Sequence, residues 1–571
     1  MLILGVHSGF HDNTACLFDD YRLLAAVSQE RLTRIKGDSG RVPDEAIDEC
    51  LTIAGRSRGQ VDVLAFGRGI FPERYYRYPR LDRLTTRRLR RALGREKQRL
   101  MLSECQRFKT LDALSLFDAP LFLAENGFRP DVEISFTNHH LAHGLPCLFH
   151  TDWPEALIYT ADGKGDNAQY SIRLFGEGRL ETLYGGDEAL MVPARVDSVG
   201  EVYSVATEVL GFTRNRHEGK LNGLAAYGKP VFYEALARHF RVDDKGEMQS
   251  DFPSYEALTD CVRSLSKGHS REDISASVQR FLENSLLEAI GTILKRHPRR
   301  FLGVSGGVFA NVRLNQRLSE ELPVEEVFVF PAMSDQGQPY GNVLDYLMRR
   351  DGMERWLANR YRLDTLYYGR DFGTAIDTCL GGDAAFKRIS GTTVETSAKL
   401  LSEGGIVAIY TNGMEYGPRA LGARTIMASP LDGQINQILN DRLSRSEFMP
   451  FAPVVMAEDA DTVFDLGPAK RYAARFMTIT CGVKDEWRNR IPAVVHVDGT
   501  ARPQVIERAQ NPLYYDILAA YKALTGVPVL VNTSFNVHEE PIINNPQECA
   551  RALADKRIDY VATQQAVYAR A

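Results

Sequence analysis

The sequence predicts an α/β protein, and three observations lead to this fold class. Short apolar runs of strand length alternate with stretches of helical periodicity along the 571 residues. Glycines, aspartates and histidines gather where apolar runs end, which is where α/β sheets bind ligands. Hydrophobic residues make up 44% of the chain and charged residues 25%, which allows sizeable buried cores. A chain of this length holds about three to five globular units.

Charge and cysteine content narrow the class of protein. The formal net charge is −5, whereas a general nucleic-acid binder usually carries an excess of basic residues. The 8 cysteines are scattered without a CxxC pair, which argues against a zinc ribbon and fits a reducing compartment. The chain shows no basic and apolar leader, and no apolar run approaches the ~18 residues of a membrane helix. We therefore expect a cytoplasmic protein without a nucleic-acid or membrane partner.

Three short apolar runs near the start predict strands separated by turns. They lie at residues 2–6, 14–18 and 23–27. The first turn contains His11 beside Asp12. Residues 80–99 instead form a strongly basic stretch with leucines at roughly helical spacing. This stretch predicts a solvated helix in an insertion, with binding of an acceptor or partner as the alternative.

The sharpest local signal is the segment NHHLAH at 138–143. His139 and His143 are four residues apart, so on a helix both imidazoles face one side and can hold one metal ion. A packed or surface histidine cluster is the alternative. Carboxylates would have to complete the coordination shell, and Asp162 and Asp335 stand at the ends of predicted strands.

Two glycine-rich segments also follow predicted strands. In the loop DGKGD at 162–166, glycines would let backbone amides approach a phosphate, and an aspartate could hold a cation. The segment SGG at 305–307 leads into a helix predicted from Val308, whose N-terminus favours an anion. Asn311 and Asn315 could reach a ribose or base. A tight turn and a plain helix entry are the respective alternatives.

The α/β alternation continues through the rest of the chain. A helical pattern covers 274–294, and a helix from Glu548 precedes one final strand. Further strands are predicted at 301–304, 326–330, 405–410 and 527–531. Residues 348–368 are charged and aromatic without clear periodicity, so we place a domain junction there.

The order of these loops resembles the two-lobed superfamily of actin, sugar kinases and heat-shock ATPases. A narrower resemblance, to the O-carbamoyltransferases of antibiotic biosynthesis and nodulation-factor modification, covers nearly the whole chain. In the first half it rests on HDNTACLFDD at 11–20, QERLTRIK at 29–36, NHHLAH at 138–143, DGKGDN at 162–167, GKLNGLAAYGKP at 219–230, SGGVFAN at 305–311 and SDQG at 334–337. In the second half it rests on EYGPRALGARTIMASP at 415–430, EFMPFAPVV at 447–455, DGTARPQ at 498–504 and NTSFN at 532–536.

The resemblance implies two domains and a two-step reaction. Residues 1–354 would form a two-lobed actin-like ATPase-fold domain, similar to the tRNA threonylcarbamoyl transferase. Residues 355–571 would form an α/β domain similar to threonylcarbamoyl-AMP synthase. There, ATP with Mg²⁺ and carbamoyl phosphate would give carbamoyl adenylate, whose carbamoyl group passes to a hydroxyl of a small-molecule acceptor, a secondary metabolite, in the first domain. A homodimer is consistent with the resemblance.

Residue roles are implied where the motifs match. The metal, Fe²⁺ or another divalent transition metal, would be held by His139, His143, Asp162 and Asp335. His11, beside Asp12, would act as general base, with a structural hydrogen bond as the alternative. Nucleotide contacts are expected from Gly163, Lys164, Gly165, Asp166, Lys220, Ser305, Gly306, Gly307, Asn311, Thr533, Ser534 and Asn536. Carbamoyl phosphate contacts are expected from Arg419, Arg424, Arg445, Arg502 and Asn532. The lysines could equally be surface residues, and a single arginine is usually solvated.

Two positions depart from the family pattern. Related synthases carry a lysine where Leu443 stands, so either Arg442 substitutes for it or the motif is aligned differently. Asn222 stands where the family often has methionine. Three other functions stay open: a tRNA-modifying threonylcarbamoyl transferase, a nucleotide-switched binding protein, and a hydrolase that releases AMP without an acceptor. The motifs EYGPRALG and DGTARPQ favour a small-molecule carbamoyltransferase.

Overall fold

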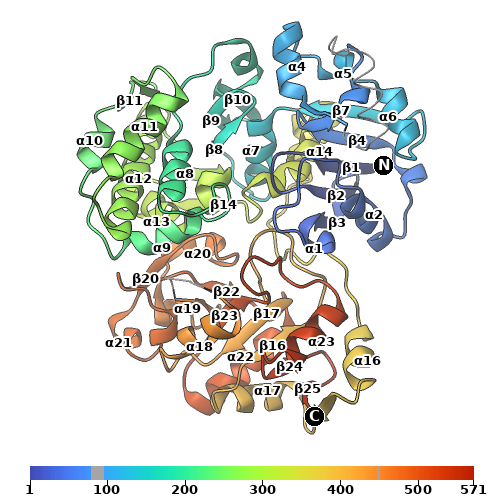
Figure 1. Cartoon of the computed structure of the whole chain (residues 1–571), viewed down its shortest axis with the longest axis vertical. Coiled ribbons are helices and arrows are strands. Elements are labelled where there is room, and N and C mark those ends of the chain that lie inside the picture. Colours follow the sequence, from blue (N-terminus) through green and yellow to red (C-terminus); the bar gives the residue numbers. More distant parts are fainter. Residues whose placement is uncertain (79–95, 446–449) are drawn as a thin grey trace. The chain divides into compact units, whose positions relative to one another are not determined.

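The computed structural model describes residues 1–78, 96–445 and 450–571 (Figure 1). These residues form two compact units, whose segments alternate along the chain. Unit 1 comprises Met1–Gly200, Leu302–Val308 and Ala332–Arg362. Unit 2 comprises Glu201–Phe301, Phe309–Pro331 and Leu363–Ala571. The helix predicted within 80–99 lies almost wholly outside the described residues, apart from the short strand β6 (Gln98–Leu100). The domain boundary at 354/355 stays a prediction.

The first sheet has the strand order β3-β2-β1-β4-β7. Its strands are β1 (Leu2–His7), β2 (Thr14–Asp19), β3 (Arg22–Ser28), β4 (Val63–Gly67) and β7 (Glu133–Thr137). The first three form an antiparallel meander, and β4 and β7 continue the sheet in parallel with β1. The three predicted N-terminal strands are confirmed to within a residue at each end.

The second sheet repeats this order as β10-β9-β8-β13-β14. Its strands are β8 (Ala156–Gly165), β9 (Ala168–Gly176), β10 (Arg179–Tyr184), β13 (Phe301–Ser305) and β14 (Glu326–Val329). Again three strands form an antiparallel meander, and β13 runs parallel to β8. The repeat of one topology in two sheets is what a two-lobed actin-like domain requires, so the predicted fold class is confirmed.

Helices connect and cover these sheets. In unit 1 they are α1 (Glu30–Thr33), α2 (Asp44–Ile53), α4 (Met101–Phe108), α5 (Ala113–Leu116), α6 (Ala119–Glu125), α7 (His139–Phe149), α14 (Gln338–Asp351) and α15 (Met353–Ala358). Helices α7 and α14 pack together. Their backbones approach closely, since a Cβ on Gly341 would lie 1.8 Å from the Ala142 carbonyl oxygen. Helices α14 and α15 cover most of 338–358, so the part of the 348–368 segment up to residue 358 is largely helical although its sequence shows no clear periodicity.

Helices of the middle segment lie in unit 2. They include α9 (Glu218–Ala225), α10 (Tyr233–Ala237), α11 (Tyr255–Ser266), α12 (Arg271–Arg296) and α13 (Val312–Glu321). Helix α12 confirms the helical pattern at 274–294. The helix predicted from Val308 begins later, because a 3₁₀ turn at Gly307–Ala310 comes first and Asn311 caps α13.

The C-terminal part of unit 2 contains an eight-stranded sheet in the order β15-β25-β24-β16-β17-β23-β18-β22. Its strands are β15 (Phe386–Ile389), β16 (Val407–Tyr410), β17 (Arg424–Ala428), β18 (Ala452–Met456), β22 (Gln504–Ile506), β23 (Val529–Ser534), β24 (Tyr560–Ala562) and β25 (Val567–Arg570). Helices α17 (Thr393–Ser402) and α22 (Pro512–Thr525) pack together, and α23 (Pro546–Ala554) precedes the last two strands. The helix and final strand predicted for the tail are confirmed by α23 and β25. The strand β24 precedes β25, and the Thr563 hydroxyl accepts from the Gln565 and Ala566 amides in the turn between them.

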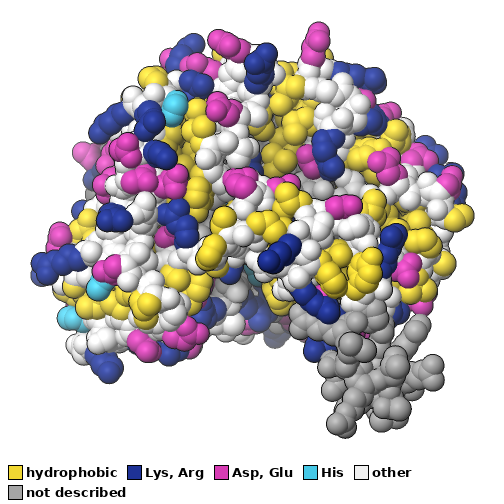
Figure 2. All heavy atoms as spheres, turned by 90° about the horizontal axis from the view of Figure 1, so that it is seen from above, with side chains coloured by type: hydrophobic (Ala, Val, Ile, Leu, Met, Phe, Trp, Pro, Cys, Tyr) yellow, Lys and Arg dark blue, Asp and Glu magenta, His cyan; other side chains and the backbone are white. Residues whose placement is uncertain are grey.

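The surface mixes charges of both signs. On the face drawn in Figure 2, lysine and arginine side chains are interspersed with aspartate and glutamate. In the described part of the chain, no helix is both long enough and apolar enough to cross a membrane.

Candidate active site

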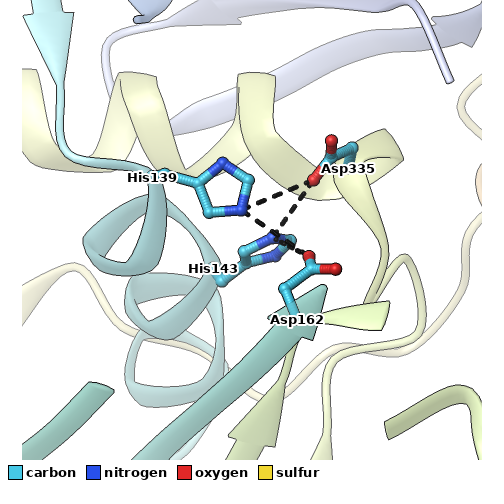
Figure 3. A group of neighbouring side chains, drawn as sticks. All are labelled: His139, His143, Asp162 and Asp335. Carbon is cyan, nitrogen blue, oxygen red and sulfur yellow. Dashed lines mark ion pairs between the residues drawn. The ribbon is translucent and has the colours of Figure 1, made fainter. Parts of the chain in front are cut away.

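Four potential metal ligands converge in unit 1 from three separate elements (Figure 3). Helix α7 supplies His139 and His143, one turn apart, as their spacing predicted. Its N-terminus is fixed by Asn138, whose side chain accepts from the Leu141 amide. Asp162 lies near the end of β8, where the register with β9 shifts, and Asp335 begins the turn before α14. The four ligand atoms all lie within 4.8 Å of one another.

The two imidazoles face the two carboxylates. His143 Nε2 lies 3.2 Å from Asp162 Oδ2 and 3.3 Å from Asp335 Oδ1. His139 Nε2 lies 3.6 and 3.7 Å from the same two oxygens. Both Nε2 atoms and Asp335 Oδ1 are buried and have no hydrogen-bond partner among the described residues. Because such atoms are costly to leave unsatisfied, and two nitrogens with two oxygens suit a divalent transition metal, the residues present fit a metal ion.

The carboxylates control the pKa values of nearby imidazoles. Burial lowers the pKa of His143, but Asp162 and Asp335 outweigh burial and raise it to about 9. Burial likewise lowers the pKa of His11, and Asp335 followed by Asp12 raises it to about 10. A cation bound to Asp335 would screen the charge that raises the His11 pKa, so these directions describe the residues without a bound ion.

The predicted catalytic pair lies beside this cluster. His11 Nε2 is 3.7 Å from Asp335 Oδ2, and His11 Nδ1 is 3.4 Å from Asp12 Oδ2. Asp12 has a left-handed backbone conformation with φ 61° and accepts a 3.2 Å hydrogen bond from the Ser334 hydroxyl. The turn at 8–12 and the segment before α14 therefore meet at Asp335, which connects His11 with the four-ligand cluster.

A buried ion-pair network holds the first turn of α7. Asp166 Oδ2 accepts hydrogen bonds from the His139 amide at 2.9 Å and from Arg68 Nη1 at 2.6 Å. Arg68 Nη2 donates to Asp187 Oδ1 at 2.9 Å. The side chains of Arg68 and Asp166 are each 4% exposed. Asp166, predicted to contact nucleotide, is thus engaged in positioning His139, and Arg68 was missed because an isolated arginine carries no sequence signal.

The glycine-rich segments of unit 1 surround the ligands. A Cβ on Gly165 would lie 1.9 Å from His139 Cδ2, and Gly306, with φ 103°, would place one 2.1 Å from the Ala161 carbonyl oxygen. The Gly307 amide donates to Asp162 Oδ2 at 3.4 Å. The turn expected at 162–166 is wrong in position, because β8 continues to Gly165 and the left-handed pair Asp166 and Asn167 makes the turn.

Other predicted nucleotide contacts have partners within the protein. Asn311 Oδ1 caps α13 and also accepts from Asn222 Nδ2 and Gln279 Nε2, each at 3.1 Å. Asn315 Nδ2 donates to two backbone carbonyls, and the Lys220 ammonium lies 5.2 Å from the centre of the Phe212 ring. Ser305 is buried, and Lys164 is exposed. Their roles in nucleotide binding stay predictions.

In the C-terminal part of unit 2, Arg445 forms hydrogen bonds with residues of the predicted nucleotide motif. Its guanidinium donates to Thr533 Oγ1 at 2.7 Å, to Ser534 Oγ at 3.1 Å and to Asn536 Oδ1 at 2.8 Å. These three residues lie at and just beyond the end of β23. Residues predicted from two separate motifs, at 445 and at 532–536, therefore form one polar cluster.

Two residues predicted to bind carbamoyl phosphate are buried and make hydrogen bonds within the fold. Arg424 is 0% exposed, stacks 3.7 Å from the Tyr410 ring centre and donates to the Thr411 carbonyl at 2.7 Å. Asn532 is buried and donates to Gln504 Oε1 at 2.6 Å. Arg419 and Arg502 are half-buried. For all four, substrate contact stays a prediction.

Two further charged residues near the predicted carbamoyl phosphate contacts also have partners within the protein. Glu415, missed from the sequence, is buried and accepts from the amides of Leu421, Ala423 and Arg424, so it shapes the loop that carries Arg419. Arg442, which could replace the lysine expected at position 443, forms a 2.7 Å ion pair with Asp559. Arg442 therefore has a partner within the protein.

Two family models match this chain. The model described as Carbamoyltransferase N-terminus matches residues 2–344, and that described as Carbamoyltransferase C-terminus matches residues 398–570. The chain belongs to the carbamoyltransferase family. The resemblance inferred from the sequence motifs is therefore confirmed.

Curated relatives agree with this assignment. Nodulation protein NolNO of Sinorhizobium fredii is 31% identical over 567 residues, covering 96% of this carbamoyltransferase and 77% of NolNO. Nodulation protein NolO of Bradyrhizobium diazoefficiens is 30% identical over 74% of this chain and 77% of its own. The Synechocystis protein sll1178 is 29% identical over 100% and 96% of the two chains. Among solved structures, full-length HypF reaches only a TM-score of 0.34 at 15% identity, over 62% of this chain and 56% of HypF.

Proposed function

We propose that this carbamoyltransferase uses ATP and carbamoyl phosphate to make carbamoyl adenylate and then transfers the carbamoyl group to a hydroxyl of a small-molecule acceptor. The observation that carries the proposal is the assembled centre of His139, His143, Asp162 and Asp335, with His11 3.7 Å from Asp335. Family membership supplies the carbamoyl chemistry, and this centre supplies a place for the transfer step.

We assign the first step to the C-terminal part of unit 2. The Arg445 guanidinium and the polar side chains of Thr533, Ser534 and Asn536 form a cluster suited to phosphate oxygens. ATP, brought in with Mg²⁺, loses pyrophosphate, and carbamoyl phosphate loses phosphate. Water cleaves carbamoyl phosphate into carbamate and phosphate. A carbamate oxygen then attacks the α-phosphorus of ATP as its bond to pyrophosphate breaks, which gives carbamoyl adenylate. The adenylate is an activated donor once it is shielded from bulk water.

We assign the second step to the cluster in unit 1. A divalent transition metal held by the four ligands, Fe²⁺ in this proposal, would stabilise negative charge on an adenylate phosphate oxygen. His11 would take the proton of the acceptor hydroxyl as that oxygen attacks the carbamoyl carbon. AMP leaves when the bond between the carbamoyl carbon and its phosphate oxygen breaks. Asp12 would orient the His11 ring through Nδ1.

Partner and location follow from the same chemistry. The net charge of −5 and the mixed surface of Figure 2 favour a small acceptor over tRNA. We place the reaction in the cytoplasm, where both substrates are made, and a homodimer stays a prediction. A filter-binding assay with labelled tRNA tests the tRNA-modifying alternative. That alternative predicts that the protein retains the tRNA on the filter.

A trapping assay tests the proposal without knowledge of the acceptor. Hydroxylamine attacks an activated carbamoyl group and yields hydroxyurea, which can be quantified by mass spectrometry. We expect hydroxyurea formation above the background of carbamoyl phosphate alone only when protein and ATP are both present. Folded, metal-loaded protein that gives no ATP-dependent hydroxyurea would overturn the proposal.

A further inference from the structure

The Asp335 carboxylate turns its two oxygens to different groups. Oδ1 faces the metal cluster, at 3.3 Å from His143 Nε2 and 3.7 Å from His139 Nε2. Oδ2 faces away from these ligands, at 3.4 Å from His7 Nε2 and 3.7 Å from His11 Nε2. This orientation leaves one oxygen of Asp335 for a cation, so the group that holds Oδ2 controls how Asp335 binds the cation.

His7 is the buried group on the Oδ2 side. It is the last residue of β1, and its side chain is 7% exposed, whereas 30% of the His11 side chain is exposed. His7 Nε2 has no hydrogen-bond partner among the described residues, although it lies within ion-pair distance of Asp335. Asp335 Oδ2, at 3.4 Å, is an acceptor within reach of this buried ring nitrogen.

The chain around His7 keeps the ring in place. A Cβ on Gly9 would lie 2.2 Å from His7 Nε2, so the loop after β1 folds directly over the ring edge that faces Asp335. The Gly9 amide donates to Asn13 Oδ1 at 3.0 Å, which fixes the loop in this position. The histidine ring therefore has little room to turn away from the carboxylate.

We propose that His7 is a positioning residue of the metal centre, which donates from Nε2 to Asp335 Oδ2 and so directs Oδ1 alone to the cation. Outer hydrogen-bond partners of this kind orient metal ligands and tune the affinity of the site. His7 lies outside the four-ligand set. The proposal rests on the metal site put forward above, and its test needs no ATP, carbamoyl phosphate or acceptor.

The test measures Co²⁺ binding to the purified, metal-free full chain by competition with a chromogenic chelator, together with the visible absorption of bound Co²⁺. His7→Phe keeps a ring of similar shape and removes the donor. His7→Gln keeps an N–H donor near the position of Nε2. His150→Gln is the matched control, because His150 is also buried but hydrogen-bonds to Tyr340 and Tyr361.

We expect His7→Phe to weaken Co²⁺ binding by about 10–100-fold, the range for lost outer-shell partners, and to alter the absorption bands because Asp335 can then bind through both oxygens. His7→Gln should recover most of the affinity, and His150→Gln should match wild type. Wild-type affinity and spectrum in folded His7→Phe would refute the inference, as would equal losses in His7→Gln or His150→Gln.

Gly9→Ala provides a second route if His7→Phe fails to fold. Its methyl group would displace the His7 ring, so it should weaken Co²⁺ binding while His7 is still present. Wild-type binding by Gly9→Ala would contradict the inference. If wild-type protein binds no Co²⁺, the metal site itself is refuted, which is distinguishable from a failure of the role of His7 alone.

Discussion

Gly165 and Gly163 offer a matched pair of substitutions at the metal centre. Both lie on β8 next to the proposed ligands, and neither has the left-handed φ that would strain an alanine. A Cβ at Gly165 would lie 1.9 Å from Cδ2 and 2.3 Å from Nε2 of His139, whereas a Cβ at Gly163 meets nothing within 4 Å. The same chemical change therefore disturbs the site at one position and leaves it intact at the other.

The size of the disturbance follows from these distances. Non-bonded carbon atoms rest about 3.5 Å apart, so in Gly165→Ala the His139 ring must move by about 1.5 Å. Metal–ligand distances tolerate only about 0.2 Å. We expect Gly165→Ala to weaken Co²⁺ binding by at least the roughly 10–100-fold seen when supporting interactions are lost. Gly163→Ala should retain wild-type cation affinity.

The measurement is Co²⁺ affinity of both variants by chelator competition, after circular dichroism has shown that each is folded. Overpacking in a well-packed core costs about 1–3 kcal/mol, so Gly165→Ala should still fold at room temperature. Equal Co²⁺ affinities of the two variants would show that the His139 ring is not held against Gly165, and would remove the argument for this ligand geometry.

Three further predictions concern the supporting contacts and the division of the reaction. Arg68→Met leaves Asp166 buried without its cation and should lower the free energy of unfolding by about 3–5 kcal/mol in urea titrations, and a loss below 1 kcal/mol would contradict the buried network. Arg445→Lys cannot make the forked contacts to the 533–536 segment, so the KM for ATP should rise about tenfold with unchanged Co²⁺ affinity, and an unchanged KM would remove Arg445 from the nucleotide site. Removal of the transition metal by a chelator, followed by addition of Mg²⁺, should stop carbamoyl transfer but leave ATP–pyrophosphate exchange intact. Loss of both activities would contradict the separation of the two steps.

Much of the fold and of the metal cluster could be predicted from the sequence. Buried strands such as β1 and β16 are continuous apolar runs between turns, so their positions follow from side-chain pattern alone. The four-residue spacing of His139 and His143 predicts a shared helix face, and α7 confirms it. Asp162 and Asp335 were candidates because they stand at the ends of predicted strands, and the family resemblance then favoured them as ligands. They lie far from these histidines in the sequence but meet them in the structure.

The roles of the other polar residues could not be predicted in the same way. Asp166 and Asn311 stand in glycine-rich motifs that resemble phosphate loops, yet their side chains hold Arg68 and the start of α13. A polar side chain that satisfies the protein's own backbone has the same sequence signature as one that faces a ligand. His7 was overlooked for the opposite reason, because its position at the end of an apolar strand gives no hint of the carboxylate that the fold brings to it.

The most direct test of the central claim is ATP–pyrophosphate exchange, measured with and without carbamoyl phosphate in wild type, Asp162→Asn and Arg445→Ala. If carbamoyl adenylate forms in the C-terminal part of unit 2, wild type and Asp162→Asn should exchange label only when carbamoyl phosphate is present, and Arg445→Ala should lose most of the exchange. Exchange that is independent of carbamoyl phosphate, or absent from folded wild-type protein under varied pH and Mg²⁺, would contradict the two-step reaction.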